Sequence, residues 1–114
     1  MNADAIDLAA RLLRDARIGH YQLVALSEAA KPRTLADGYA VQERLLELLG
    51  TEPAGWLLGL TNAYMQRSFH VDQPYYARLL APNLHRSPAR FRSDAFLTRG
   101  LECEIAFRMA QDVP

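Results

Sequence analysis

This 114-residue chain has little cysteine, no net charge and no long apolar run. Its single cysteine, Cys103, cannot form an internal disulfide, which fits a reducing cytoplasm. Thirteen basic residues balance thirteen acidic ones, so no overall field attracts nucleic acid. The basic stretch "HRSPARFRS" contains Pro88 and two serines and predicts a solvated loop. Without a signal peptide pattern or an apolar run of transmembrane length, the sequence predicts a cytoplasmic protein that binds neither nucleic acid nor membranes.

The apolar content is the first positive signal, because half of the residues are apolar and can form one modest core. We therefore expect residues 1–114 to form a single unit whose first part, residues 1–53, is mainly helical. Apolar residues at helical spacing predict one amphipathic helix over 3–16 and a second over 35–49. Thr34 is a suitable N-cap for the second helix, and Gly50 is a suitable end.

The later part of the chain reads as short strands separated by turns. The run "WLLGLT" at 56–61 predicts a buried strand, and Asn62 can cap a short helix over 62–69. Trp56, Tyr39 and Phe107 are candidates for the core. Helices that precede strands predict an α+β fold rather than alternating parallel units. The remaining expected strands fall within residues 77–83, 89–100 and 101–110.

Two glutamates, Glu102 and Glu104, lie two residues apart in the apolar run "LECEIAFRMA". In a strand they would share one face, about 7 Å apart along the backbone, because successive side chains alternate. Like charges so placed repel unless water screens them or a cation lies between them. Mg²⁺ or Mn²⁺ would suit, since these hard ions accept carboxylate oxygens. The spacing alone leaves the site open, and such glutamates more often face solvent.

Asp72 is the other candidate carboxylate, and it lies just before a proline turn in "HVDQPYY". It can stabilise the turn by accepting hydrogen bonds from nearby backbone N–H groups. It can also act as a general acid or base, or orient a group beside a substrate. The histidines His20, His70 and His85 are more typical of surface or loop positions than of a metal site.

Three segments in order carry a family resemblance: "TLADGYAVQ", "GWLLGLTNAYMQRSFHVDQPYYARLL" and "ECEIAFRMAQDVP". Together they resemble the 2-keto-4-pentenoate hydratase and 2-oxo-3-hexenedioate decarboxylase family of the fumarylacetoacetate hydrolase superfamily. The resemblance implies that N-terminal helices are followed by short strands that begin a fumarylacetoacetate-hydrolase-like mixed β fold. Residues 54–114 would then start its β-rich catalytic domain. It also implies that Glu102 and Glu104 bind a divalent metal, Mg²⁺ or Mn²⁺, and that Asp72 is catalytic.

The activity implied by the resemblance is hydration of 2-hydroxypenta-2,4-dienoate-type 2-oxo acids in aromatic-compound catabolism. A 2-oxo acid can chelate the cation through its carboxylate and C2 oxygen, and the metal then stabilises negative charge on that oxygen. The same electron sink would serve 2-oxo-3-hexenedioate decarboxylation, so the E-x-E pair does not separate the two reactions. The resemblance also implies a homo-oligomer, or association with a full-length relative.

Two departures from the family pattern favour a third alternative. The family usually reads G-W-K-I-G-L-T, whereas this chain has Leu57 in place of the lysine. An isobutyl group can neither transfer a proton nor hold a carboxylate. Members also run to well over twice this length, so the resemblance implies a truncated N-terminal portion without the third acidic metal ligand. A non-catalytic remnant, or a partner subunit of a full-length relative, is therefore also open.

Overall fold

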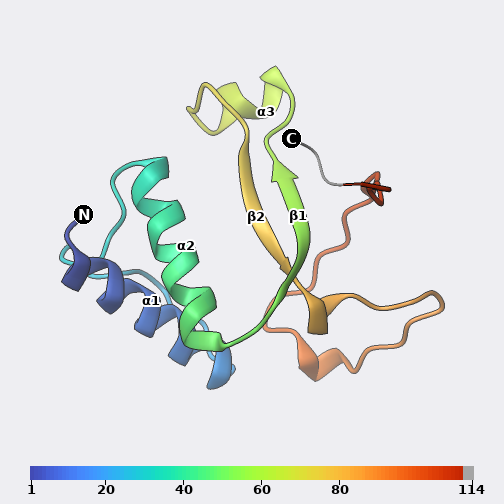
Figure 1. Ribbon diagram of the computed structural model, residues 1–114, viewed down its shortest axis with the longest axis horizontal. Coiled ribbons are helices and arrows are strands. Elements are labelled where there is room, and N and C mark those ends of the chain that lie inside the picture. The colour runs from blue at the N-terminus through green and yellow to red at the C-terminus, as the bar shows by residue number, and fades with distance from the viewer. Residues whose placement is uncertain (112–114) are drawn as a thin grey trace.

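A pair of helices and a two-stranded hairpin make up most of the computed structural model, which describes residues 1–111 (Figure 1). Residues 112–114, the end of the expected single unit, lie outside the described residues. Within the described part, three α-helices and one antiparallel sheet make the fold mixed α+β, as the sequence predicted. No helix in residues 1–111 is long and apolar enough to cross a membrane.

Helices α1 (Ala3–Ile18) and α2 (Leu35–Leu49) form the only core among the described residues. Ala9 and Ala10 of α1 are fully buried, and they meet Val41 of α2 and Ala30 of the connecting segment. Small side chains on α1 let the two helix backbones approach closely, as Figure 1 shows. Larger side chains surround this contact and are partly buried against it: Ile6, Leu12, Leu13, Leu26, Leu45 and Leu48.

The start of α2 is fixed by a reciprocal capping box between Thr34 and Asp37. The Thr34 hydroxyl accepts a hydrogen bond from the Asp37 N–H at 3.1 Å, and the Asp37 carboxylate accepts one from the Thr34 N–H at 3.1 Å. The Met1 amino group also donates to Asp37. This bond and those from the backbone hold the pKa of Asp37 at about 2, so the cap stays ionised at neutral pH. The predicted start and end of α2 are confirmed.

Strands β1 (Pro53–Gly59) and β2 (Tyr75–Leu80) pair antiparallel, with α3 (Ala63–Ser68) in the connection between them. The first strand begins three residues earlier than the predicted "WLLGLT" strand and ends two residues sooner. As predicted, Asn62 caps α3, accepting a hydrogen bond from the Met65 N–H at 2.9 Å. In Figure 1 the hairpin stands beside α2, with α3 beyond the end of β1.

The hairpin docks on α2 through three aromatic rings. Tyr39 of α2 stacks on Tyr76 of β2 with centroids 4.1 Å apart, and Trp56 of β1 meets Tyr76 edge-on at 5.2 Å. The Arg78 guanidinium lies 3.6 Å from the Trp56 ring centroid, a cation–π contact. A hydrogen bond from the Arg78 backbone N–H to the side-chain oxygen of Gln42, at 3.2 Å, completes the contact.

Two of the predicted strands are wrong. Residues 89–100 contain only a short 3₁₀ turn (Ser93–Ala95), and residues 101–110 have no regular secondary structure. The third predicted segment, 77–83, contributes to β2 and then enters a 3₁₀ turn (Ala81–Asn83). A strand gains its backbone hydrogen bonds from a neighbouring strand, and within residues 1–111 only β1 and β2 pair. A short segment bounded by turn residues therefore did not suffice to form a strand.

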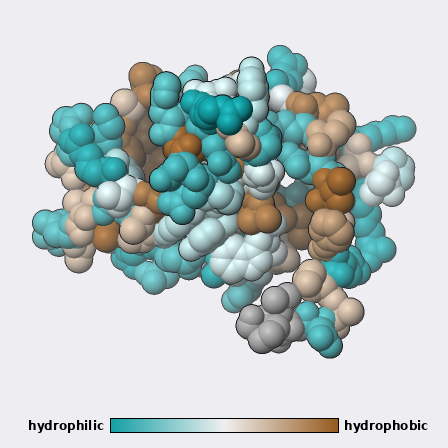
Figure 2. All heavy atoms as spheres, turned by 90° about the horizontal axis from the view of Figure 1, so that it is seen from above, coloured by the Kyte–Doolittle hydropathy of each residue, from teal (hydrophilic) through white to brown (hydrophobic). Residues whose placement is uncertain are grey.

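The core prediction was also wrong for two aromatic residues. Trp56 is 53% exposed and Phe107 is 84% exposed. The first lies on a hairpin with only one helix packed against it, and the second follows the last regular element, where no described segment covers it. Figure 2 shows the result, with brown apolar side chains at the surface among teal polar ones.

Candidate functional site

Asp72 lies in the connection from α3 to β2, where the chain turns back toward the hairpin. The end of α3 is closed by hydrogen bonds from the His70 N–H to the Arg67 carbonyl at 3.2 Å and from the Val71 N–H to the Gln66 carbonyl at 3.0 Å. His70 takes a left-handed conformation, φ 55°, which these two bonds stabilise. The next two residues bring Asp72 into an exposed bend.

This connection is tied to the end of β1. The side-chain amide of Gln66 donates a hydrogen bond to the Leu60 carbonyl at 2.8 Å, and Leu60 itself has a left-handed backbone, φ 54°. Across the sheet, Gly59 pairs with Tyr75, so the two ends of the connection meet at the last residues of the hairpin. These contacts hold Asp72 near the hairpin tip, in the short connection between α3 and β2.

Glu102 and Glu104 lie in an extended segment outside the sheet. Both are exposed, and the neighbouring apolar residues Leu101 and Ile105 are 93% and 84% exposed. Cys103 between them is a free, exposed thiol. The two carboxylates supply oxygen ligands of the type that Mg²⁺ and Mn²⁺ accept, so their chemistry fits such an ion. They provide only two of the several ligands that it needs.

The structure does not bring the three predicted site residues together. Residues 1–111 contain no cluster of three or more His, Cys, Asp or Glu side chains able to hold a metal ion. In Figure 1 the connection that carries Asp72 lies above the hairpin on the α2 side, whereas the C-terminal segment lies on the far side of β1. The metal and catalytic roles of Glu102, Glu104 and Asp72 stay predictions.

Leu57 occupies the centre of β1, where it pairs with Ala77. Its side chain is 40% exposed and so leaves part of an isobutyl group on the sheet surface. The strand is regular at this position, since the irregularity in the β1–β2 register lies earlier, between Pro53 and Gly55. Leu57 thus supplies an apolar contact where an ammonium group would supply charge.

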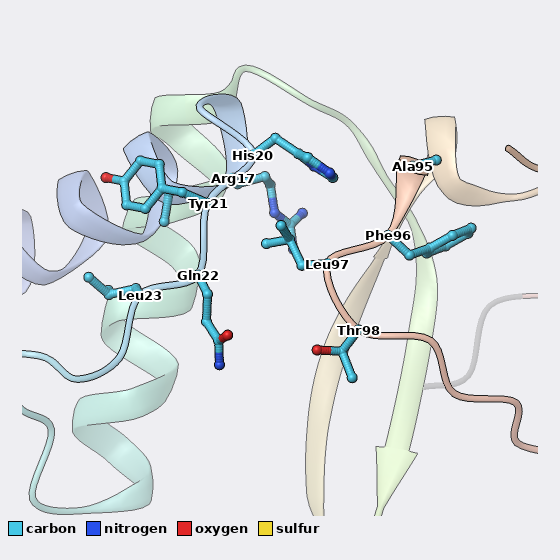
Figure 3. Close-up of a pocket in the computed structure, with 10 residues that line it drawn as sticks. Arg17, His20, Tyr21, Gln22, Leu23, Ala95, Phe96, Leu97 and Thr98 are labelled. Carbon is cyan, nitrogen blue, oxygen red and sulfur yellow. The ribbon is translucent and has the colours of Figure 1, made fainter. Parts of the chain in front are cut away.

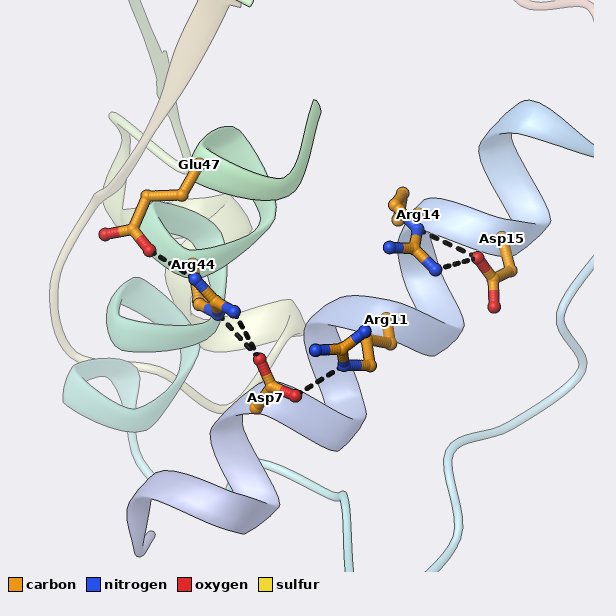
Figure 4. Close-up of polar contacts among 6 residues, drawn as sticks. All are labelled: Asp7, Arg11, Arg14, Asp15, Arg44 and Glu47. Carbon is orange, nitrogen blue, oxygen red and sulfur yellow. Dashed lines mark hydrogen bonds and ion pairs between the residues drawn. The ribbon is translucent and has the colours of Figure 1, made fainter. Parts of the chain in front are cut away.

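The densest charged cluster joins α1 to α2 and has a structural role (Figure 4). The Asp7 carboxylate accepts hydrogen bonds from Arg11 at 2.5 Å and from Arg44 at 2.7 Å, and Arg44 also pairs with Glu47 at 2.7 Å. These contacts, led by the bond from Arg11, lower the pKa of Asp7. The pairs are partly or largely exposed, so each adds little stability, and of the three only the Asp7–Arg44 pair crosses from α1 to α2.

Comparison with known proteins points to one class, the hydratases. No family model matches the sequence. The chain is 31% identical over 107 residues to a 2-oxo-hept-4-ene-1,7-dioate hydratase of Escherichia coli, a match that covers 91% of this chain and 40% of that protein. It is also 31% identical over 113 residues to the TodF product hydratase of Pseudomonas putida strain F1, covering 96% of this chain and 42% of the relative. The chain thus spans about two-fifths of the length of these curated relatives.

Proposed function

We propose that this chain is part of a hydratase of the 2-keto-4-pentenoate hydratase family, within the fumarylacetoacetate hydrolase superfamily. Its substrate would be a 2-hydroxypenta-2,4-dienoate-type 2-oxo acid from aromatic-compound catabolism. The observation that carries the proposal is the similarity to two named hydratases over more than nine-tenths of the chain. Both matches extend across the segments that contain Asp72, Glu102 and Glu104, because they cover 91% and 96% of the chain.

The residues would divide the chemistry between them. Glu102 and Glu104 would hold Mg²⁺ or Mn²⁺, which when bound would stabilise negative charge developing on the C2 oxygen of the substrate. Asp72 would orient the attacking water or move a proton, and its exposed bend at the hairpin tip leaves the carboxylate open to a substrate. Both carboxylates of the pair are exposed and so are equally free to turn toward an ion.

A metal titration tests the ligand assignment. Removing both carboxylates with Glu102→Gln, Glu104→Gln should abolish the heat of Mn²⁺ binding measured by calorimetry, because the amides carry no charge to attract the ion. The matched control is Asp4→Asn, Glu52→Gln, which removes two exposed carboxylates elsewhere and should keep the native heat. Equal heats from the native chain and the Glu102, Glu104 variant would reject the assignment.

One observation favours a second candidate, a non-catalytic partner of a full-length relative. Leu57 places an apolar side chain at the family's lysine position, where it cannot exchange a proton. Loss of the dienoate absorbance, followed with the native chain and with Leu57→Lys, separates the candidates. We expect the variant to be at least about a hundredfold faster, the lower end of what a positioned proton-transfer group contributes. Absence of activity in both would favour the non-catalytic partner over the hydratase and the decarboxylase alike.

A further inference from the structure

A shallow, open hollow of about 470 Å³ lies between the C-terminal end of α1 and residues 95–98, which are more than seventy positions later in the chain. Figure 3 shows Arg17 reaching from the end of α1 toward Leu97, while the Gln22 amide and the Thr98 hydroxyl face the same space. Leu97 adds an apolar wall, whereas the Phe96 ring points away from α1 and packs edge-on against Phe91. The hollow therefore combines several hydrogen-bond donors with an apolar side.

The carbonyl groups at the end of α1, beside the hollow, are paired by backbone hydrogen bonds. The Gly19 N–H bonds the Asp15 carbonyl at 2.8 Å, the His20 N–H bonds the Arg17 carbonyl at 3.4 Å, and the Tyr21 N–H bonds the Ala16 carbonyl at 3.1 Å. This is the usual closure of a helix by a left-handed residue, but that residue is His20, φ 50°, and not glycine. The carbonyl groups at the negative end of α1 thus accept hydrogen bonds from the residues that follow the helix.

His20 also joins the two sides of the hollow. Its Nε2 lies 3.0 Å from the Asp94 backbone carbonyl, the atom that precedes the 95–98 segment. His20 thus both takes the left-handed conformation that closes α1 and supplies a contact that places the later segment against the end of the helix.

The charge of the hollow is positive and not cancelled by the carboxylates around it. Asp94 is paired with Arg92 through two hydrogen bonds of 2.9 and 2.5 Å, which lower the pKa of Asp94. Asp15, near the end of α1, is paired with Arg14 at 2.6 Å. Arg17 makes no ion pair within residues 1–111. Its guanidinium is therefore available to an anion.

We propose that this hollow binds a small organic carboxylate with an apolar body. The planar guanidinium of Arg17 matches a carboxylate through two parallel hydrogen bonds, and Thr98 and Gln22 offer further donors. Leu97 would cover the hydrocarbon part of the ligand. Asp72, Glu102 and Glu104 do not line the hollow, so this is a second site, independent of the proposed metal chemistry.

Nuclear magnetic resonance titration of the ¹⁵N-labelled chain tests this site with benzoate as the probe and benzamide as its uncharged counterpart. Benzoate should shift the backbone amide signals of Gln22, Phe96 and Thr98, and benzamide should bind roughly tenfold or more weakly, because it lacks the charge that Arg17 pairs. Arg17→Gln should weaken benzoate binding by a similar factor. Arg11→Gln, on the same helix but outside the hollow, should bind like the native chain.

Three outcomes would overturn the proposal: equal binding of benzoate and benzamide, native affinity in Arg17→Gln, or an equal loss in Arg11→Gln. Thr98→Val provides a second variant, because it removes only the hydroxyl and keeps the size of the side chain. It should weaken benzoate and leave the far-ultraviolet circular dichroism unchanged. Native affinity in this variant would show that Thr98 does not bind the ligand. It would then contradict a site formed jointly by the end of α1 and residues 95–98.

Discussion

Tyr76→Ala is expected to release the β1–β2 hairpin from α2. The ring stacks on Tyr39 of α2 and meets Trp56 of β1 edge-on, so one substitution removes the aromatic contact between the hairpin and α2 together with an aromatic contact inside the hairpin. Tyr76 is 38% exposed, which reduces the loss below that of a fully buried ring. We expect a cost of about 2 kcal/mol in the free energy of docking.

Two probes in one urea titration can detect this release. The chain has a single tryptophan, so Trp56 fluorescence reports on the hairpin, while circular dichroism at 222 nm reports mainly on the helices. In Tyr76→Ala the fluorescence midpoint should fall well below the helix midpoint. Tyr64→Ala is the control, because this tyrosine of α3 is 71% exposed and should leave both midpoints unchanged. Coincident midpoints in Tyr76→Ala would contradict the docking role.

Ala10→Leu is expected to separate α1 from α2. Ala10 is fully buried where the helices touch, and the added isobutyl atoms have no space without moving the helix backbones apart. Overpacking of this kind costs about 1–3 kcal/mol, a large share of the stability of a small core. Thermal unfolding followed at 222 nm should show a midpoint lowered by roughly 5–15 °C, as expected for a domain of this size.

Ala3→Leu is the matched control for this substitution. It makes the same chemical change at an exposed position in the first turn of α1. Its melting temperature should stay within a few degrees of the native value, since leucine and alanine are both good helix formers. If both variants melt at the same temperature, the close contact at Ala10 does not limit the core.

The helices were predictable because their signals are local. Apolar spacing, the Thr34 cap and Gly50 fixed α2 at its observed bounds, and α1 differed from the prediction only by two further residues at its end. Strands depend on partners far along the chain. β1 and β2 pair with each other, whereas residues 101–110, also predicted as a short strand, have no partner in the described part.

The candidate sites show the same difference between local signals, which the sequence carries, and contacts between distant segments, which it does not. Asp72, Glu102 and Glu104 were singled out by short motifs, but a motif does not say whether distant segments meet, and the structure leaves these residues apart. The hollow beside α1 was missed because it depends on a contact between His20 and Asp94, which are 74 residues apart. The basic residue Arg17 in the last turn, followed by Gly19 as a break, was the only signal in the sequence.

The Gln42 side chain also affects how the molecule resists aggregation. Its oxygen accepts a hydrogen bond from the Arg78 N–H of β2, a donor that points away from β1 and would otherwise be free to pair with a strand of another molecule. The side-chain amide of Gln42, on α2, here accepts the hydrogen bond that a neighbouring strand would otherwise accept. A foreign strand could add to β2 at this point only after displacing α2, so the contact that positions the hairpin also protects its edge.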